Sequence, residues 1–222
     1  MTASGQPSDP LAVARRFQFP GEILSATPYG SGHINGTWAI SCHPPARFIL
    51  QRIHPQIFKN PVALMENIQR VTSHLAAQLA TQLPDEPAAS RRVLTLIPAR
   101  DGQAWHVDAD GSYWRAWRFI DRARSYDTVE TTQQAWQAAH AFGQFQQLLA
   151  NLPAPRLHDT IPYFHHTPKR LEALEQAIAA DSVNRAALAQ PEIDFVLARQ
   201  SIAGVLLRAN LPERVTDRKS VV

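Results

Sequence analysis

The sequence has a single cysteine, no long apolar run and no block of charges of one sign. Because Cys42 stands alone, no disulfide can form within the chain. No stretch approaches the roughly 20 apolar residues of a membrane-spanning helix, and residues 1–10 lack the apolar segment of a signal peptide. The net charge of +3 comes largely from scattered arginines. These absences predict a protein of the reducing cytoplasm that has neither a membrane nor a nucleic acid as a partner.

The length and the order of the expected elements favour an α+β protein with two lobes. The 222 residues, of which 45% are hydrophobic, are enough to bury a substantial core. Strand-like segments dominate the first half and helical segments the second. We therefore expect a flexible leader at 1–15, a first lobe at 16–122 and the beginning of a helical second lobe at 123–216.

Alternation and helical spacing predict the individual elements. Strands are expected over residues 22–27, 37–41, 47–53, 93–97, 105–107 and 113–120. A long helix should follow, with Asn60 as its N-cap and Pro61 at its first position, where the missing N–H costs nothing. Its apolar stripe is Leu64, Ile68, Val71, Leu75 and Leu79. Further helices are expected over 131–149, 169–180 and 192–210.

Three of the nine glycines stand close together between the first two expected strands. They are Gly30, Gly32 and Gly36, in a turn that also holds Ser31, His33 and Asn35. Because glycine has no Cβ, such a turn can expose backbone N–H groups and let a phosphate come close. The turn is a candidate flap over a nucleotide. It could equally be an ordinary hairpin whose glycines only allow the chain to reverse.

A nucleotide site of the kinase type also needs a cation on the third strand and a carboxylate on the next helix. Arg52 is the favoured cation, but alternation places Gln51 on the opposite face, so only one of the two can face the nucleotide. Glu66 is the candidate carboxylate. It could pair with Arg52, or with Arg70 one helical turn further on.

Residues 119–121 stand where a hinge between two lobes would hold an adenine ring. Phe119 and Ile120 could sandwich the base, or the segment could be the plain end of an edge strand. His158, His165 and His166 cluster in the second half without a second group at zinc spacing. We expect no metal site there.

Several short blocks, in one order, resemble a known family. They are GSGHIN at 30–35 and FILQRI at 48–53, followed by blocks at 58–61, 64–68, 113–115, 141–143, 161–165 and 211–216. Together they resemble the aminoglycoside phosphotransferase and choline kinase family, and most of all its N-acetylhexosamine 1-kinase-like branch. The resemblance implies a protein-kinase-like fold, with an antiparallel-sheet N-lobe that includes one long helix, and a helical C-lobe.

The resemblance also implies an activity and its ligands. The family transfers the γ-phosphate of ATP, with Mg²⁺, to a small-molecule hydroxyl, which in this branch belongs to a sugar. The candidate nucleotide-binding residues are Gly30, Ser31, Gly32, His33, Asn35, Gln51, Arg52, Glu66, Phe119 and Ile120.

The sequence departs from the family after Thr216. There the family has a His-x-Asp loop whose Asp orients the acceptor, then an Asn and a later Asp that hold the metal, whereas this chain continues only as DRKSVV. We interpret residues 217–222 as a non-native tail. On that hypothesis the chain is an inactive fragment of a longer phosphotransferase, with an incomplete C-lobe and no catalytic or metal-binding residue of its own. The alternative is a non-catalytic nucleotide-binding or interaction module.

Overall fold

The computed structural model describes residues 8–82 and 91–209. Contacts divide the chain into a first unit that ends at Thr160 and a second that begins at Ile161, and each is described by itself. Within the described ranges, no helix is both long and apolar enough to cross a membrane. The boundary predicted near residue 122 separates a nucleotide-binding lobe from an acceptor-binding lobe. This functional division stays a prediction.

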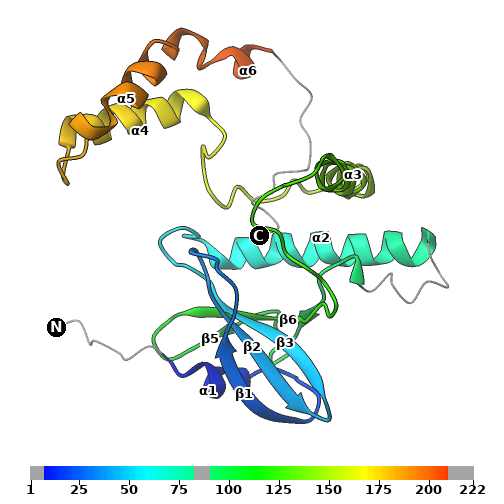
Figure 1. Cartoon of the computed structure of the whole chain (residues 1–222). Coiled ribbons are helices and arrows are strands. Elements are labelled where there is room, and N and C mark those ends of the chain that lie inside the picture. Colours follow the sequence, from blue (N-terminus) through cyan, green and yellow to red (C-terminus); the bar gives the residue numbers. More distant parts are fainter. Residues whose placement is uncertain (1–7, 83–90, 210–222) are drawn as a thin grey trace. The chain divides into compact units, whose positions relative to one another are not determined.

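An antiparallel sheet of six strands forms the centre of the first unit (Figure 1). Five of its strands follow one another in the order β1 (Glu22–Pro28), β2 (Gly36–His43), β3 (Ala46–Arg52), β6 (Tyr113–Arg118) and β4 (Leu96–Ile97). The short strand β5 (His106–Val107) also pairs with β6. The predicted strands are all found, although only the last two residues of the 93–97 segment are in strand conformation.

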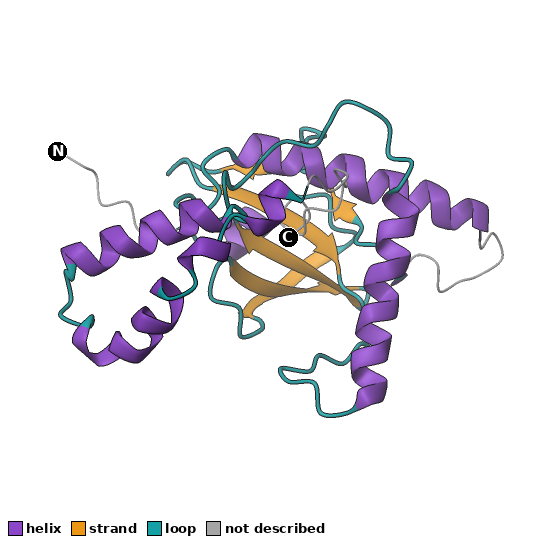
Figure 2. Ribbon diagram, turned by 90° about the horizontal axis from the view of Figure 1, so that it is seen from above, coloured by secondary structure: helices purple, strands orange, loops and turns teal. Residues whose placement is uncertain are grey.

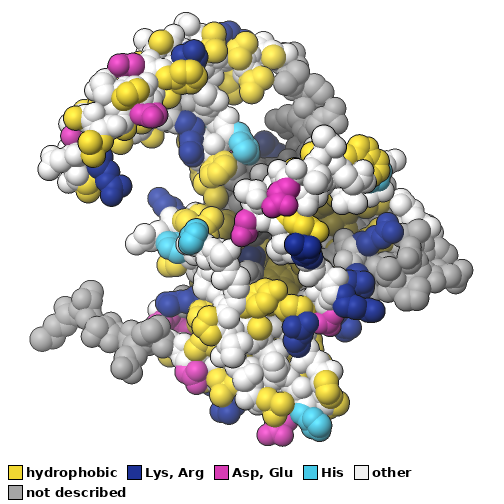
Figure 3. Space-filling view, in the orientation of Figure 1, with side chains coloured by type: hydrophobic (Ala, Val, Ile, Leu, Met, Phe, Trp, Pro, Cys, Tyr) yellow, Lys and Arg dark blue, Asp and Glu magenta, His cyan; other side chains and the backbone are white. Residues whose placement is uncertain are grey.

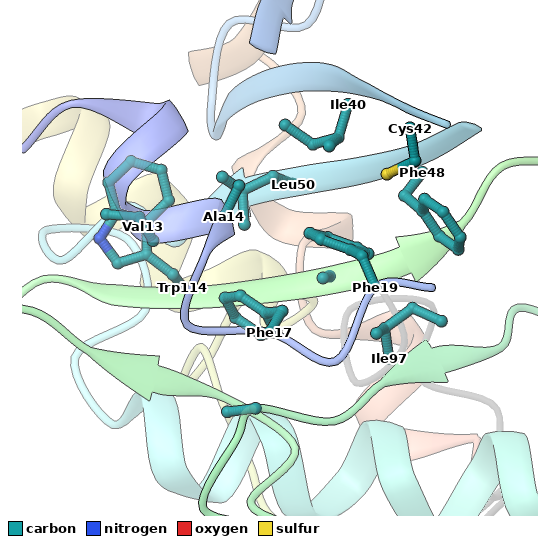
Figure 4. Packing of buried hydrophobic residues seen from close by; sticks show 12 residues of the cluster. Val13, Ala14, Phe17, Phe19, Ile40, Cys42, Phe48, Leu50, Ile97 and Trp114 are labelled. Carbon is teal, nitrogen blue, oxygen red and sulfur yellow. The ribbon is translucent and has the colours of Figure 1, made fainter. Parts of the chain in front are cut away.

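One face of the sheet carries an apolar core. Trp38 stands opposite Leu50, which in turn stands opposite Ala116, and side chains alternate along each strand, so these residues share a face. The buried residues of this core are Val13, Ala14, Phe17, Phe19, Ile40, Cys42, Phe48, Leu50, Ile97, Ala99, Trp114 and Ala116 (Figure 4). Burial raises the pKa of the Cys42 thiol. The opposite face presents the remaining positions of the same strands, among them Gln51 and Arg115.

Helix α1 (Pro10–Ala14) packs against this core and corrects one prediction. The Asp9 side chain caps the helix by accepting a hydrogen bond from the Leu11 N–H at 3.1 Å. Val13 and Ala14 are 4% and 0% exposed. The flexible leader expected over 1–15 is therefore wrong for this helix, because two of its apolar residues help to close one face of the sheet. Residues 1–7 lie outside the described ranges.

Helix α2 (Pro61–Gln82) lies on the other side of the sheet from α1 (Figure 1). It begins as predicted, because the Asn60 side-chain oxygen accepts a hydrogen bond from the Ala63 N–H at 3.0 Å and Pro61 is the first residue. The predicted apolar stripe is confirmed as well. All five of its residues are buried, namely Leu64, Ile68, Val71, Leu75 and Leu79.

Helix α3 (Thr132–Leu149) packs against α2 (Figure 2). Thr131 and Gln134 form a capping box: the Gln134 N–H donates to Thr131 Oγ1 at 3.2 Å, and the Thr131 N–H donates to Gln134 Oε1 at 3.1 Å. Leu149 is buried in a cluster with apolar residues of α2. Phe142 of the same helix is 54% exposed.

The second unit contains helix α4 (Thr167–Ala180) and a series of short helices. The single helix expected over 192–210 is wrong in the described part, which holds α5 (Gln190–Leu197), the 3-10 turn Gln200–Ile202 and α6 (Val205–Arg208). Gly204 precedes α6, where glycine disfavours a continuous helix. Several apolar side chains of this stretch are exposed, so little burial stabilises a longer helix (Figure 3).

Candidate nucleotide-binding site

The glycine turn between β1 and β2 is exposed on the first unit. Gly30 has a φ of +81°, in the left-handed region that favours glycine. A Cβ added at Gly30 or Gly32 would meet no atom within 4 Å, so a ligand could approach the backbone there. Gly36 differs, because its Cβ would lie 2.6 Å from the Trp38 ring. Packing within the hairpin accounts for that glycine.

Asn35 fastens the turn to the end of β3. Its side-chain oxygen accepts a hydrogen bond from the His54 N–H at 3.0 Å, and its backbone oxygen accepts one from the Thr37 hydroxyl at 3.4 Å. These bonds fix the base of the turn and leave its tip exposed. Contacts of the turn with a nucleotide stay a prediction for Gly30, Ser31, Gly32, His33 and Asn35.

Tyr29 and Phe119 bring the glycine turn next to the expected hinge. Their ring centroids are 5.4 Å apart, in an edge-to-face arrangement. The guanidinium of Arg47 lies 4.0 Å from the centroid of the Phe119 ring, and Arg47 Nε donates to Asp121 Oδ1 at 3.1 Å. Phe119 and Ile120 are half-buried. The sequence predicted the hinge segment but gave no role to Tyr29 or Arg47. The register of β3 with β6 places Arg47 opposite Phe119, whose N–H donates to the Arg47 backbone oxygen at 3.2 Å.

The register of the sheet decides how Gln51 is oriented. Gln51 stands opposite Thr37 on β2 and Arg115 on β6. Its Nε2 donates to Thr37 Oγ1 at 3.2 Å, and its Oε1 accepts from Arg115 Nε at 3.0 Å. Tyr29 directly follows β1 and Phe119 directly follows β6. Continuing the alternation of side chains along these two strands places both rings on the face that carries Gln51. Gln51 therefore shares its face of the sheet with the aromatic pair.

Arg52 belongs to the other face, where it is already paired. Its Nε and its terminal nitrogen donate to Ser112 Oγ at 2.9 Å and 2.6 Å, and the terminal nitrogen is 3.3 Å from Asp110 Oδ2. Hydrogen bonds with Asp108 and Ser112, and then the charge of Arg52, lower the pKa of Asp110 to about 2. The Asp110 carboxylate is thus ionised at neutral pH and offsets the charge of Arg52. Gln51 and Arg52 thus point to opposite faces, as the alternation predicted, and which of them faces a phosphate stays a prediction.

Glu66 forms neither of the two pairs that the sequence suggested. Its Oε2 lies 2.8 Å from His158 Nε2. Arg70 instead donates to the backbone oxygens of Pro153 and Pro155, at 2.8 Å and 2.6 Å. Both side chains of α2 thus hold the segment after α3, so the structure gives Glu66 a structural contact. A role for Glu66 in nucleotide binding stays a prediction.

Arg115 is a cation that the sequence reasoning missed. Only 2% of its surface is exposed, and its Nη1 has no hydrogen-bond partner among the described residues. Burial lowers its pKa to about 10, so the guanidinium is still charged at neutral pH. The signal in the sequence was a basic residue between the large apolar side chains of Trp114 and Trp117, in the middle of the strand.

No group of three or more His, Cys, Asp or Glu side chains that could hold a metal ion occurs among the described residues. Of the clustered histidines, His158 contacts Glu66, and His166 caps α4 by accepting a hydrogen bond from the Lys169 N–H at 3.2 Å.

Comparison with known proteins identifies the fold. No family model matches the chain. Among solved structures, the amicoumacin kinase hAmiN in complex with AMP-PNP, Ca²⁺ and Ami aligns with a TM-score of 0.56 at 11% identity, over 92% of this chain. The spectinomycin phosphotransferase APH(9)-Ia, solved with ADP and spectinomycin, aligns with a TM-score of 0.54 at 8% identity, over 88% of this chain.

The predicted fold class is thereby confirmed. The chain has the α+β fold of these small-molecule kinases, in which an antiparallel sheet and its helix precede further helices. The alignments cover 54% and 56% of the two kinases, so this chain spans about half of their length.

Proposed function

We propose that this chain is the nucleotide-binding part of a longer small-molecule phosphotransferase that uses ATP. The main support is the arrangement of one sheet face, on which Tyr29, Phe119 and Gln51 lie beside an exposed glycine turn. The fold supports the same class of activity. The family resemblance of the sequence blocks adds the substrate class, a sugar of the N-acetylhexosamine type.

The residues suggest where each part of ATP would bind. The adenine would stack near Tyr29, Phe119 and Ile120, because aromatic faces bind bases of any kind. The phosphates would lie under the glycine turn, where backbone N–H groups of residues 30–33 can donate to them. Gln51 would add a side-chain donor at the end of β3.

Phosphoryl transfer also needs groups that hold Mg²⁺ and orient the acceptor hydroxyl. In the family, Mg²⁺ and the acceptor hydroxyl are held by residues that follow the position of Thr216. The described residues hold no group of three or more His, Cys, Asp or Glu side chains, and we assign no Mg²⁺ ligand among them. We therefore propose only the nucleotide-binding role for the described residues.

Titration of the 222-residue chain with a fluorescent ATP analogue tests the proposal. Phe119→Ala should weaken binding about tenfold, since stacking on an aromatic ring is worth roughly 1–3 kcal/mol per base. Phe142→Ala is the matched control, because Phe142 is exposed on α3 and lies outside the site. Saturable binding that is weakened only by Phe119→Ala supports the proposal, and wild-type protein that does not bind the analogue refutes it.

A further inference from the structure

Gln51 is held by three side chains from two neighbouring strands. Its Oε1 accepts hydrogen bonds from Arg115 Nε at 3.0 Å and from Trp117 Nε1 at 3.1 Å. Its Nε2 donates to Thr37 Oγ1 at 3.2 Å. Both donors can only donate, so the Gln51 oxygen must face β6 and its amino group must face β2. The orientation of this carboxamide is therefore determined.

The amino group of Gln51 keeps a second N–H beyond the one it gives to Thr37, because a primary amide has two. Gln51 is half-buried, whereas Arg115 behind it is almost fully buried. A ligand that comes under the glycine turn would thus meet Gln51 before Arg115. A guanidinium that donates to Oε1 also polarises the amide and makes its N–H groups better donors.

The charge of Arg115 is not balanced within the described residues. None of the described carboxylates forms an ion pair with it, and its Nη1 has no hydrogen-bond partner there. Burying a charge without a counter-charge is unfavourable. Arg52, the residue after Gln51 on β3, differs from Arg115 because its charge is paired with the Asp110 carboxylate. The face with the aromatic pair therefore holds an uncompensated positive charge behind a neutral, oriented donor.

We propose that Arg115 is a positioning residue for the phosphates of the bound nucleotide, acting through Gln51. Arg115 and Trp117 orient the Gln51 carboxamide so that its free N–H donates to a phosphate oxygen, and the guanidinium supplies positive charge from the layer behind. On this inference, the cation on the Gln51 face is Arg115 of β6, because Arg52 of β3 points to the opposite face. The inference rests on the proposed nucleotide binding and names the part of the ligand that this network recognises.

The test compares ATP with adenosine, which has the same base and ribose but no phosphate. Arg115→Met should weaken ATP binding about tenfold or more, as expected for the loss of a charge-assisted contact, and leave adenosine binding unchanged. Arg115→Lys should recover part of the ATP affinity, because it keeps the charge and loses the fixed geometry. Arg118→Met is the control: Arg118 is exposed on the same strand, and alternation places it on the other face.

Gln51→Glu separates positioning from a merely structural role. The glutamate would place a carboxylate beside Arg115, so the urea midpoint of the free protein should rise. The same carboxylate would repel phosphate, so ATP binding should weaken by more than tenfold with adenosine binding unchanged. A network that only stabilises the sheet would show no such difference between the two ligands.

Each result has one meaning. Loss of ATP affinity with unchanged adenosine affinity in Arg115→Met and Gln51→Glu supports the inference. If the wild-type protein binds ATP and these two variants bind it equally well, or lose adenosine to the same extent, the inference alone is overturned. If the wild-type protein binds neither ligand, the proposed function fails and this inference fails with it.

Discussion

Asn67 and His158 exchange two hydrogen bonds over a separation of 91 residues. Asn67 Nδ2 donates to the His158 backbone oxygen, and the His158 N–H donates to Asn67 Oδ1, both at 2.9 Å. Asn67 is fully buried in α2. The Asn67 amide thus pairs with both the N–H and the C=O of His158. Together with Glu66 and Arg70, it anchors the segment after α3 to α2.

Replacing Asn67 by Leu should destabilise the fold by about 2–3 kcal/mol. The substitution keeps the size of the side chain but leaves the N–H and C=O of His158 without their partners. Urea unfolding followed by circular dichroism measures the effect. Gln69→Leu, at an exposed position of the same helix, should change the stability by less than about 0.5 kcal/mol. Equal effects of the two variants would contradict a specific role for the Asn67 amide.

Helix α1 should be needed to protect Cys42. Ala14 is fully buried against the same core as Cys42, so Ala14→Asp should cost about 3–5 kcal/mol by burying an unpaired charge. The thiol, whose pKa is raised by burial, should then react much faster with Ellman's reagent. Ala12→Asp, at an exposed position of α1, is the control. A slow thiol in the Ala14→Asp variant would place α1 outside the core.

Two glycines of the turn should respond differently to valine. Gly36→Val should destabilise the hairpin by about 1–3 kcal/mol, because the new side chain overlaps the Trp38 ring. Gly32→Val should leave the melting temperature nearly unchanged, since its Cβ meets open space, but should weaken binding of the fluorescent ATP analogue. Unchanged nucleotide affinity in a folded Gly32→Val protein would argue against a flap.

Arg52 and Glu66 should behave as independent residues. Their partners differ, since Arg52 contacts Asp110 and Glu66 contacts His158. The effects of Arg52→Ala and Glu66→Ala on unfolding free energy should therefore add within about 0.5 kcal/mol in the double variant. The cycle of Arg52→Ala and Asp110→Ala should instead show a coupling of about 0.5–1 kcal/mol. Coupling between Arg52 and Glu66 would restore the pair that the sequence suggested.

The sequence by itself determined most of the local structure. Asn60 and Pro61 begin α2, and the apolar stripe from Leu64 to Leu79 is buried, because capping and helical spacing are properties of neighbouring residues. The first three strands and the glycine turn were predictable for the same reason. Helical spacing alone was not always enough. Residues 192–210 have helical spacing, but the described structure breaks them into short helices.

Only the tertiary structure decided which side chains meet at the candidate site. Alternation shows that Gln51 and Arg52 point to opposite faces, but not which face is closed by the core. The packing of Val13 and Ala14 decides that, because α1 closes the face of Leu50, whereas α2 and the aromatic pair lie on the face of Gln51. The partners of Gln51 and Glu66 come from 64 and 92 positions further along the chain, at Arg115 and His158. Such pairs depend on the register of the sheet and the path of the later chain, which no local pattern contains.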